Sequence, residues 1–169
     1  GETDLQSCTE REWQKLRGRR MSMIMQDPKY SLNPVKTVGN QIGETCRLHL
    51  NSSRKEAEQR SLAMLEAVKI RDPEMVLQLY PHQLSGGMGQ RVMIAMMLVA
   101  EPDVLIADEP TSALDVTVQN EVLRILDDLV RERGMGLMFI SHNLTVVSSF
   151  CDRVLIMYGG KIVEECAAR

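Results

Sequence analysis

Short apolar runs alternate with amphipathic stretches in the second half of the chain. Residues 104–107, 137–140 and 154–157 are apolar with little alternation, which is typical of strands buried on both faces of a parallel sheet. Residues 117–133 place apolar side chains at helical spacing, and residues 143–150 predict a shorter helix. The order strand, helix, strand, helix, strand therefore predicts an α/β fold built in layers, with right-handed crossovers.

The first half of the chain begins with one helix pattern and one strand pattern. Residues 9–17 predict a short polar helix, and residues 20–25 predict a strand. Pro28 ends this strand, because proline has no N–H to donate to a sheet. Gln26 is therefore expected at the carboxyl tip of the strand.

Residues 38–80 follow a helical pattern and predict a helical insert rather than sheet. Ser53 and Glu56 form a capping box at the start of one helix. Asp72 and Pro73 are expected to cap and open another, shorter helix. The insert thus separates the first strand from the strands that follow.

Two short segments carry candidate chemistry. Residues 84–88 form a glycine-rich loop that leads into an apolar helix over residues 90–100, and a loop at the start of a helix attracts anions. Asp108 and Glu109 end a buried strand, where one acid can hold magnesium while its neighbour orients or deprotonates a water molecule. Taken alone, an acidic pair of this kind is typical of a solvated turn or a helix cap.

Composition narrows the class of protein. The 169 residues are 44% hydrophobic and 25% charged, which suits one globular domain with a sizeable core. The formal net charge of -3 provides no basic field, so nucleic acid is not an expected partner. The apolar runs fall short of the roughly 20 residues that span a bilayer. Four cysteines lack zinc-site spacing and are interpreted as free thiols in a reducing compartment: Cys8, Cys46, Cys151 and Cys166.

Five segments, in the right order, resemble the motifs of the ABC transporter ATPase domain, and the combination is far more specific than any one motif. Over residues 20–165, the resemblance implies a P-loop NTPase-like (RecA-like) α/β fold, with a mostly parallel sheet and a helical subdomain insert. Residues 1–37 would form the Q-loop strand region, residues 38–88 the helical subdomain with the signature loop, and residues 89–169 the core with the remaining motifs. The segments are the Q-loop (residues 25–28), the signature loop (84–88), Walker B (104–110), the D-loop (112–115) and the H-loop (Ser141 and His142).

The resemblance gives a role to each polar residue at the strand ends. Asp108 would hold Mg²⁺, and Glu109 would polarise the water that attacks ATP. His142 would contact the γ-phosphate and keep that water aligned with Glu109. Gln26 would contact Mg²⁺ and the water, and would relay the state of the nucleotide to the helical subdomain.

The signature loop and the D-loop would serve a second subunit. Ser85, Gly86 and Gly87 would bind the γ-phosphate of the nucleotide held by the opposite ATPase subunit, and Asp115 would lie at the same interface. Two subunits, identical or different, would thus enclose two ATP molecules head to tail. The plain alternative for this loop is a glycine turn that caps a helix. Gly89 departs from the family, where a longer polar or basic residue is common.

Within the family, the methionine that ends the signature loop and the segment 26–34 are similar to importers of oligopeptides, dipeptides and nickel. The resemblance implies a peripheral, ATP-hydrolysing subunit that energises uptake from the cytoplasmic face of the inner membrane. Its partners would be transmembrane permease subunits, docked on Gln26 and residues 38–80, and indirectly a solute-binding protein. The alternatives are a non-transport ABC ATPase and a non-catalytic module that only donates its signature loop.

The P-loop pattern Gly-x-x-x-x-Gly-Lys-Ser/Thr does not occur in these 169 residues. A P-loop supplies the backbone cradle and the lysine for the β- and γ-phosphates. We therefore expect the N-terminal part of the ATPase domain to precede Gly1, and the chain by itself to be inactive. In the family's strand order the P-loop strand lies between the strands at 137–140 and 154–157. These two strands are not expected to pair, and a foreign strand or a rearrangement should separate them.

Overall fold

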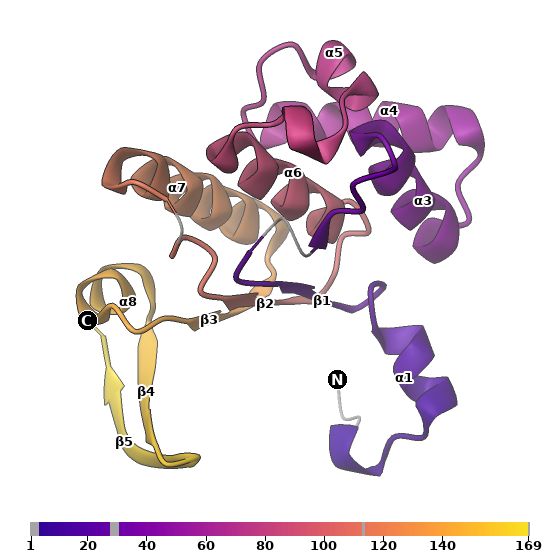
Figure 1. Cartoon of the computed structure of the whole chain (residues 1–169). Coiled ribbons are helices and arrows are strands. Elements are labelled where there is room, and N and C mark those ends of the chain that lie inside the picture. Colours follow the sequence, from indigo (N-terminus) through magenta and orange to yellow (C-terminus); the bar gives the residue numbers. More distant parts are fainter. Residues whose placement is uncertain (1–3, 28–30, 113, 169) are drawn as a thin grey trace.

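The computed structural model describes residues 4–27, 31–112 and 114–168, and a parallel sheet of three strands lies at its centre (Figure 1). Each of these strands was predicted from the sequence. Because all three run in the same direction and in register, their carboxyl ends meet at one edge of the sheet. In sheet order the strands are β1 (Met21–Ile24), β2 (Val104–Asp108) and β3 (Gly136–Ile140).

Two long helices lie over one face of the sheet (Figure 1). α6 (Gly86–Leu98) begins earlier than the predicted residue 90, because Ser85 is its N-cap and the Ser85 Oγ accepts a hydrogen bond from the N–H of Met88 at 3.3 Å. α7 (Val116–Arg133) ends at Gly134, as predicted, and the φ of 61° at this residue suits glycine. Strand side chains on the covered face are fully buried, among them Ile24, Leu105 and Ala107.

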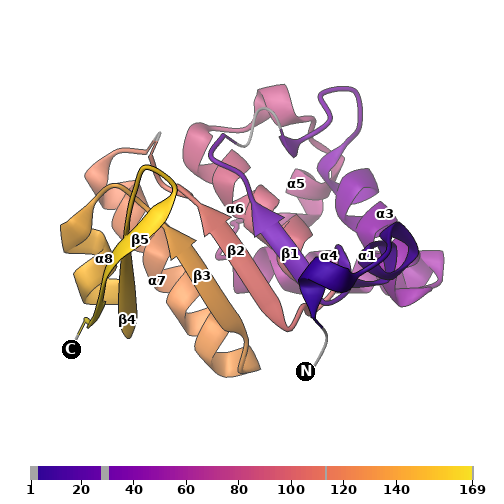
Figure 2. The ribbon, with the colours of Figure 1, turned by 90° about the horizontal axis from the view of Figure 1, so that it is seen from below.

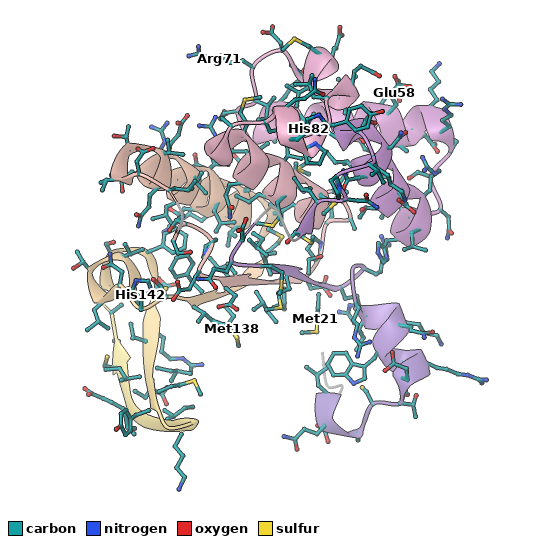
Figure 3. All side chains as sticks on the ribbon, viewed as in Figure 1. Met21, Glu58, Arg71, His82, Met138 and His142 are labelled. Carbon is teal, nitrogen blue, oxygen red and sulfur yellow. The ribbon has the colours of Figure 1, made fainter. Side chains whose placement is uncertain are left out.

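The opposite face of the sheet is uncovered within the described residues, so the prediction of strands buried on both faces is wrong (Figure 2). Met23, Met138 and Ile140 are 39%, 56% and 44% exposed. Met21 and Met138 project from this face (Figure 3). Apolar residues on both faces of a strand indicate that both faces can be buried, but they do not specify what covers each one.

A cluster of three helices packs against α6 on the side away from the sheet (Figure 1). It consists of α3 (Val38–Leu50), α4 (Arg54–Ala67) and α5 (Pro73–Gln78), which confirms the helical pattern predicted for this part of the chain. The capping box of α4 is also confirmed. The N–H of Ser53 donates to Oε2 of Glu56 at 2.8 Å, and the N–H of Glu56 donates to Oγ of Ser53 at 3.3 Å.

Shorter helices join or precede these elements. Asp72 takes the N-cap position of α5 with a φ of 51°, but its side chain makes no capping hydrogen bond, so the predicted cap is wrong in this respect. η2 (Pro81–Gln83) leads into the glycine-rich loop. η1 (Leu5–Ser7) and α1 (Glu10–Leu16) form an arm on the uncovered side of the sheet, and α1 confirms the short polar helix (Figures 1 and 2).

The C-terminal part of the chain forms an antiparallel hairpin rather than the predicted further parallel strand. α8 (Leu144–Phe150) leads to β4 (Arg153–Tyr158), which pairs with β5 (Lys161–Ala167) in a separate sheet. Gly159 and Gly160 have φ values of 56° and 77°, as a two-residue type I′ turn requires, so the glycine pair reverses the chain. Among the described residues β3 does not pair with β4, in agreement with the expected strand order.

One hydrophobic core joins the sheet, the two long helices and the helical cluster. No described helix has both the length and the apolar character needed to cross a membrane. The four cysteines are free thiols, as expected. Fully buried members of the core include Ile42, Leu65, Ile94 and Leu126.

Candidate active site

Glu109 lies in a turn directly after β2, and its backbone is held by its neighbours. Its φ is 44°, a left-handed conformation that costs a residue other than glycine on the order of 1–3 kcal/mol. Its N–H donates to the carbonyl of Ile140 at 3.0 Å, and its own carbonyl accepts from the N–H and the Oγ of Ser112, both at 3.2 Å. The turn is therefore fixed both by the end of the neighbouring strand and by the loop that follows it.

The side chain of Glu109 meets that of His142, which follows β3. Oε1 of Glu109 lies 2.6 Å from Nδ1 of His142. The His142 side chain is 77% exposed and lies next to α8 (Figure 3), whereas that of Glu109 is 22% exposed, so the carboxylate is the sheltered partner. A carboxylate oriented by an imidazole is suited to position a water molecule and accept its proton. The structure thus brings together the two residues to which the family resemblance gives catalytic roles.

Asp108 and Gln26 lie at the same edge of the sheet. Asp108 is the last residue of β2 and is half-buried, and Gln26 is exposed just beyond the end of β1. The described residues contain no group of three or more His, Cys, Asp or Glu side chains that could hold a metal ion. Mg²⁺ usually keeps several waters and takes one or two protein ligands together with phosphate oxygens. One carboxylate from Asp108 and one amide oxygen from Gln26 fit that donor set.

The glycine-rich loop and Asp115 lie around a separate cavity of about 770 Å³, which Glu109 and His142 do not line. The predicted site residues therefore fall into two groups on different surfaces, one at the strand ends and one at the start of α6. Basic and acidic side chains both line this cavity. Its lining consists of Lys69, Ile70, Arg71, residues 85–88, Arg91, Leu114, Asp115, Val118 and Glu121.

The two glycines of the loop differ in their surroundings. A Cβ atom added to Gly87 would lie 2.7 Å from Cγ1 of Val118 in α7, so any other residue there would force α6 or Val118 to shift. A Cβ atom added to Gly86 would meet nothing within 4 Å. Packing of the described residues therefore explains Gly87 but gives no reason for Gly86, which faces open space.

Both polar residues of this second group also have local structural roles. Ser85 caps α6, and a hydroxyl that accepts one hydrogen bond still has its own hydrogen to donate. Oδ1 of Asp115 accepts from the N–H groups of Thr117 at 3.0 Å and Val118 at 3.1 Å, which makes Asp115 the N-cap of α7. The plain alternative of a helix-capping loop is thus part of the structure, and the capping role of Asp115 was not expected from the sequence.

Sequence reasoning missed two residues in α6. Gln90 is 2% exposed, and its Nε2 donates to the carbonyl of Pro110, the residue after Glu109. Arg91 pairs with Glu121 of α7 at 2.6 Å and donates to the carbonyl of Lys69 at 3.0 Å. The available signal was a polar pair at the start of an otherwise apolar helix, because such side chains are buried only when they have partners.

Comparisons with known proteins agree with the motifs and the fold. The family model described as ABC transporter matches residues 2–112, so this chain belongs to the ABC transporter family. It is 51% identical over 164 residues to the probable peptide ABC transporter ATP-binding protein y4tR of Sinorhizobium fredii, covering 97% of this chain and 49% of that protein. It is 55% identical over 149 residues to the glutathione import ATP-binding protein GsiA of Escherichia coli K12, covering 88% and 24%. The chain thus spans half or less of the length of these relatives.

Solved structures show the same fold. The dimeric ATP-binding cassette MJ0796, bound to ADP and Pi, superimposes with a TM-score of 0.84 at 26% identity, covering 96% of this chain and 69% of that chain. The protein cbiO1 of Clostridium perfringens, part of the ABC transporter complex cbiONQ, gives a TM-score of 0.77 at 28% identity, covering 89% and 58%. The predicted P-loop NTPase-like α/β class is therefore confirmed.

Proposed function

We propose that the protein containing this chain is an ATP-hydrolysing subunit of an importer for peptides or a related small solute. The observation that carries this proposal is the contact of 2.6 Å between Glu109 and His142, at the strand edge that also holds Asp108. The relatives support a peptide as the solute. One is described as a probable peptide transporter protein and another as a glutathione importer protein, and glutathione is a tripeptide. The subunit would lie at the cytoplasmic face of the membrane as a peripheral partner of the permease.

In this proposal the strand-end residues perform hydrolysis. His142 holds one oxygen of the Glu109 carboxylate, which leaves the second oxygen to orient a water molecule toward the γ-phosphate and accept its proton. Asp108 and Gln26 offer oxygen ligands to Mg²⁺, which when bound neutralises charge on the phosphates. The fixed backbone of Glu109 keeps the carboxylate in one place, so little reorganisation is needed during the reaction.

The second group of residues serves the nucleotide of a second, identical or different, ATPase subunit. Ser85 and Gly86 present a hydroxyl, backbone N–H groups and the start of α6 to open space, which suits a phosphate group. Packing within the described chain does not explain why residue 86 is a glycine, whereas a phosphate group that approaches from outside would explain it. The dimeric state of the MJ0796 cassette supports the same arrangement. Asp115, as the cap of α7, would lie at this interface.

The helical cluster is the surface that we propose for the permease subunits, which in turn would receive solute from a solute-binding protein. It is connected to the active site through Gln26 on one side and through the start of α6 on the other. Val35, Leu48 and Met75, in or next to this cluster, are 80%, 71% and 56% exposed. These side chains would provide apolar contacts for a permease subunit. Crosslinks from a permease that fall mainly on α7 would show that this surface is assigned to the wrong side.

Substitution of Glu109 by glutamine in the full-length protein tests the catalytic assignment. We expect kcat for ATP hydrolysis to fall by about 100-fold or more, because a general base contributes about 10²–10⁴ to the rate. ATP binding should persist, since the carboxylate acts on the water rather than the nucleotide. The variant should therefore accumulate as an ATP-bound dimer in gel filtration.

The matched control is Glu132→Gln, which removes the same charge from an exposed glutamate in the last turn of α7. This variant should hydrolyse ATP at the rate of the unmodified protein. An unchanged rate in Glu109→Gln, or an equal loss in Glu132→Gln, contradicts the assignment. A variant that loses ATP binding together with hydrolysis points to a structural role for Glu109 instead.

A further inference from the structure

A buried hydrogen bond connects the start of α6 with the turn that holds Glu109. Gln90 is 2% exposed in a helix whose other buried residues are apolar or glycine. Its Nε2 donates to the carbonyl of Pro110, which is also buried. A buried amide is costly unless it is paired, and a buried carbonyl also needs a partner, so each group satisfies the other. This bond therefore fixes the start of α6 to the turn that holds Glu109.

Pro110 transmits this contact to Glu109. The ring of Pro110 fixes its φ, so when its carbonyl is held, the peptide unit that joins it to Glu109 can move only through rotation about ψ of Pro110. Glu109 itself has a φ of 44°, which persists only because surrounding contacts maintain it. Contacts to Ile140 and Ser112 hold Glu109 from the side of β3 and from the following loop. The hydrogen bond from Gln90 to Pro110 restrains the same turn from the side of α6.

We propose that Gln90 is a positioning residue for Glu109 and that it couples the glycine-rich loop to the catalytic carboxylate of the same chain. This inference rests on the proposed function, because it assigns Glu109 to hydrolysis. Gln90 lies in the second turn of α6, close to Ser85 and Gly86, so a ligand that shifts the start of this helix also shifts the donor to Pro110. Arg91, the next residue, ties the same turn to α7 through Glu121. Binding of a ligand at the loop thereby changes the position of Glu109.

The first test is Gln90→Met in the full-length protein, which keeps the size of the side chain and removes its donor. We expect kcat for ATP hydrolysis to fall by about 10- to 100-fold, because small displacements of a catalytic group have effects of that size, whereas KM stays within about twofold. The matched control is Arg133→Met. Arg133 donates to the carbonyl of Leu98 at the far end of the same helix at 3.1 Å. Both variants should have a lower Tm, but only Gln90→Met should lose turnover.

A second measurement separates positioning from a general structural effect. If Gln90 acts through the Glu109 carboxylate, then Gln90→Met should lower the residual rate of a Glu109→Gln protein by no more than about twofold. An equal fractional loss in both backgrounds means that Gln90 acts elsewhere and overturns the proposal. An unchanged kcat in Gln90→Met, or a matching loss in Arg133→Met, overturns it as well.

Gln90→Glu keeps the test decisive if the methionine variant does not fold. A buried glutamic acid can donate to the carbonyl of Pro110 while it is protonated, but repels that carbonyl once it is ionised. The rate of this variant relative to the unmodified protein should therefore fall as the pH rises, whereas a pH-independent ratio refutes the proposal. If the unmodified protein hydrolyses ATP and Glu109→Gln abolishes this, a normal rate in the Gln90 variants removes only this inference. If the unmodified protein does not hydrolyse ATP, the proposed function and this inference fall together.

Discussion

Substitution of Gly87 by alanine should strain the contact between α6 and α7. The new Cβ would lie 2.7 Å from Cγ1 of Val118, whereas non-bonded carbon atoms are most stable about 3.5–4.0 Å apart. Valine has a stiff χ1 and cannot easily turn away, so the helices must separate by up to about 1 Å. Overpacking of this kind costs about 1–3 kcal/mol, and the better helix propensity of alanine returns up to about 1 kcal/mol. We expect a net loss of about 1 kcal/mol in the free energy of unfolding.

Gly86→Ala is the matched comparison, because the same methyl group is added one residue earlier. Its Cβ would meet nothing within 4 Å, so the free energy of unfolding should be unchanged or should rise by up to about 1 kcal/mol. The methyl group would nevertheless occupy the space that we assign to a phosphate of the opposite subunit. ATP-dependent dimerisation of the Glu109→Gln protein should therefore be weakened by Gly86→Ala.

Urea unfolding of the full-length variants, with and without Val118→Ala, measures the contact directly. Removal of the valine side chain relieves the clash, so the double-mutant cycle should give a coupling of about 1 kcal/mol or more between Gly87→Ala and Val118→Ala. Equal effects of Gly87→Ala in both backgrounds would refute the packing argument. Normal dimerisation of Gly86→Ala would refute the assignment of the open space to a phosphate.

The isolated 169-residue chain should show no Mg-ATPase turnover, because no P-loop pattern occurs in it to hold the phosphates, and hydrolysis that disappears in Glu109→Gln would contradict this. Asp115→Ala should lower the free energy of unfolding by about 0.5–2 kcal/mol, because the α7 cap is lost. Asp115→Asn should retain the stability of the unmodified protein, since asparagine is an equally good N-cap. Equal decreases in the urea midpoints of the two variants would count against the capping role. Burial, with a smaller contribution from Arg19, lowers the pKa of His49. The stability that His49 contributes is therefore complete above its unfolded pKa of about 6.5 and is lost as the pH falls through that value toward the lower folded pKa. His49→Gln should reduce the loss of stability between about pH 7 and pH 5. An identical pH dependence in the two proteins would exclude this role.

Local elements of the fold, and the polar residues at the edge where the parallel strands end, could be predicted from the sequence. Ser53 and Glu56 predicted the start of α4, and Gly134 predicted the end of α7, because capping bonds and left-handed glycines are properties of a few adjacent residues. That Glu109 and His142 act together was implied by the resemblance to the ABC family, and the strand pattern agrees with it. Each residue ends or follows a predicted strand, and the carboxyl ends of parallel strands lie at one edge of a sheet.

Which surfaces are covered and which distant groups form pairs could be learned only from the folded chain. The apolar residues of the strands did not reveal that one face, with Met23 and Met138, is uncovered in the described chain, because a hydrophobic pattern shows what can be buried and not what covers it. The hairpin of β4 and β5, by contrast, has a local cause, because Gly159 and Gly160 both take the positive φ values of a two-residue turn. Gln90 could not be connected with Pro110 from the sequence, since a bond between a side chain and a distant carbonyl exists only after the helix has packed beside the sheet.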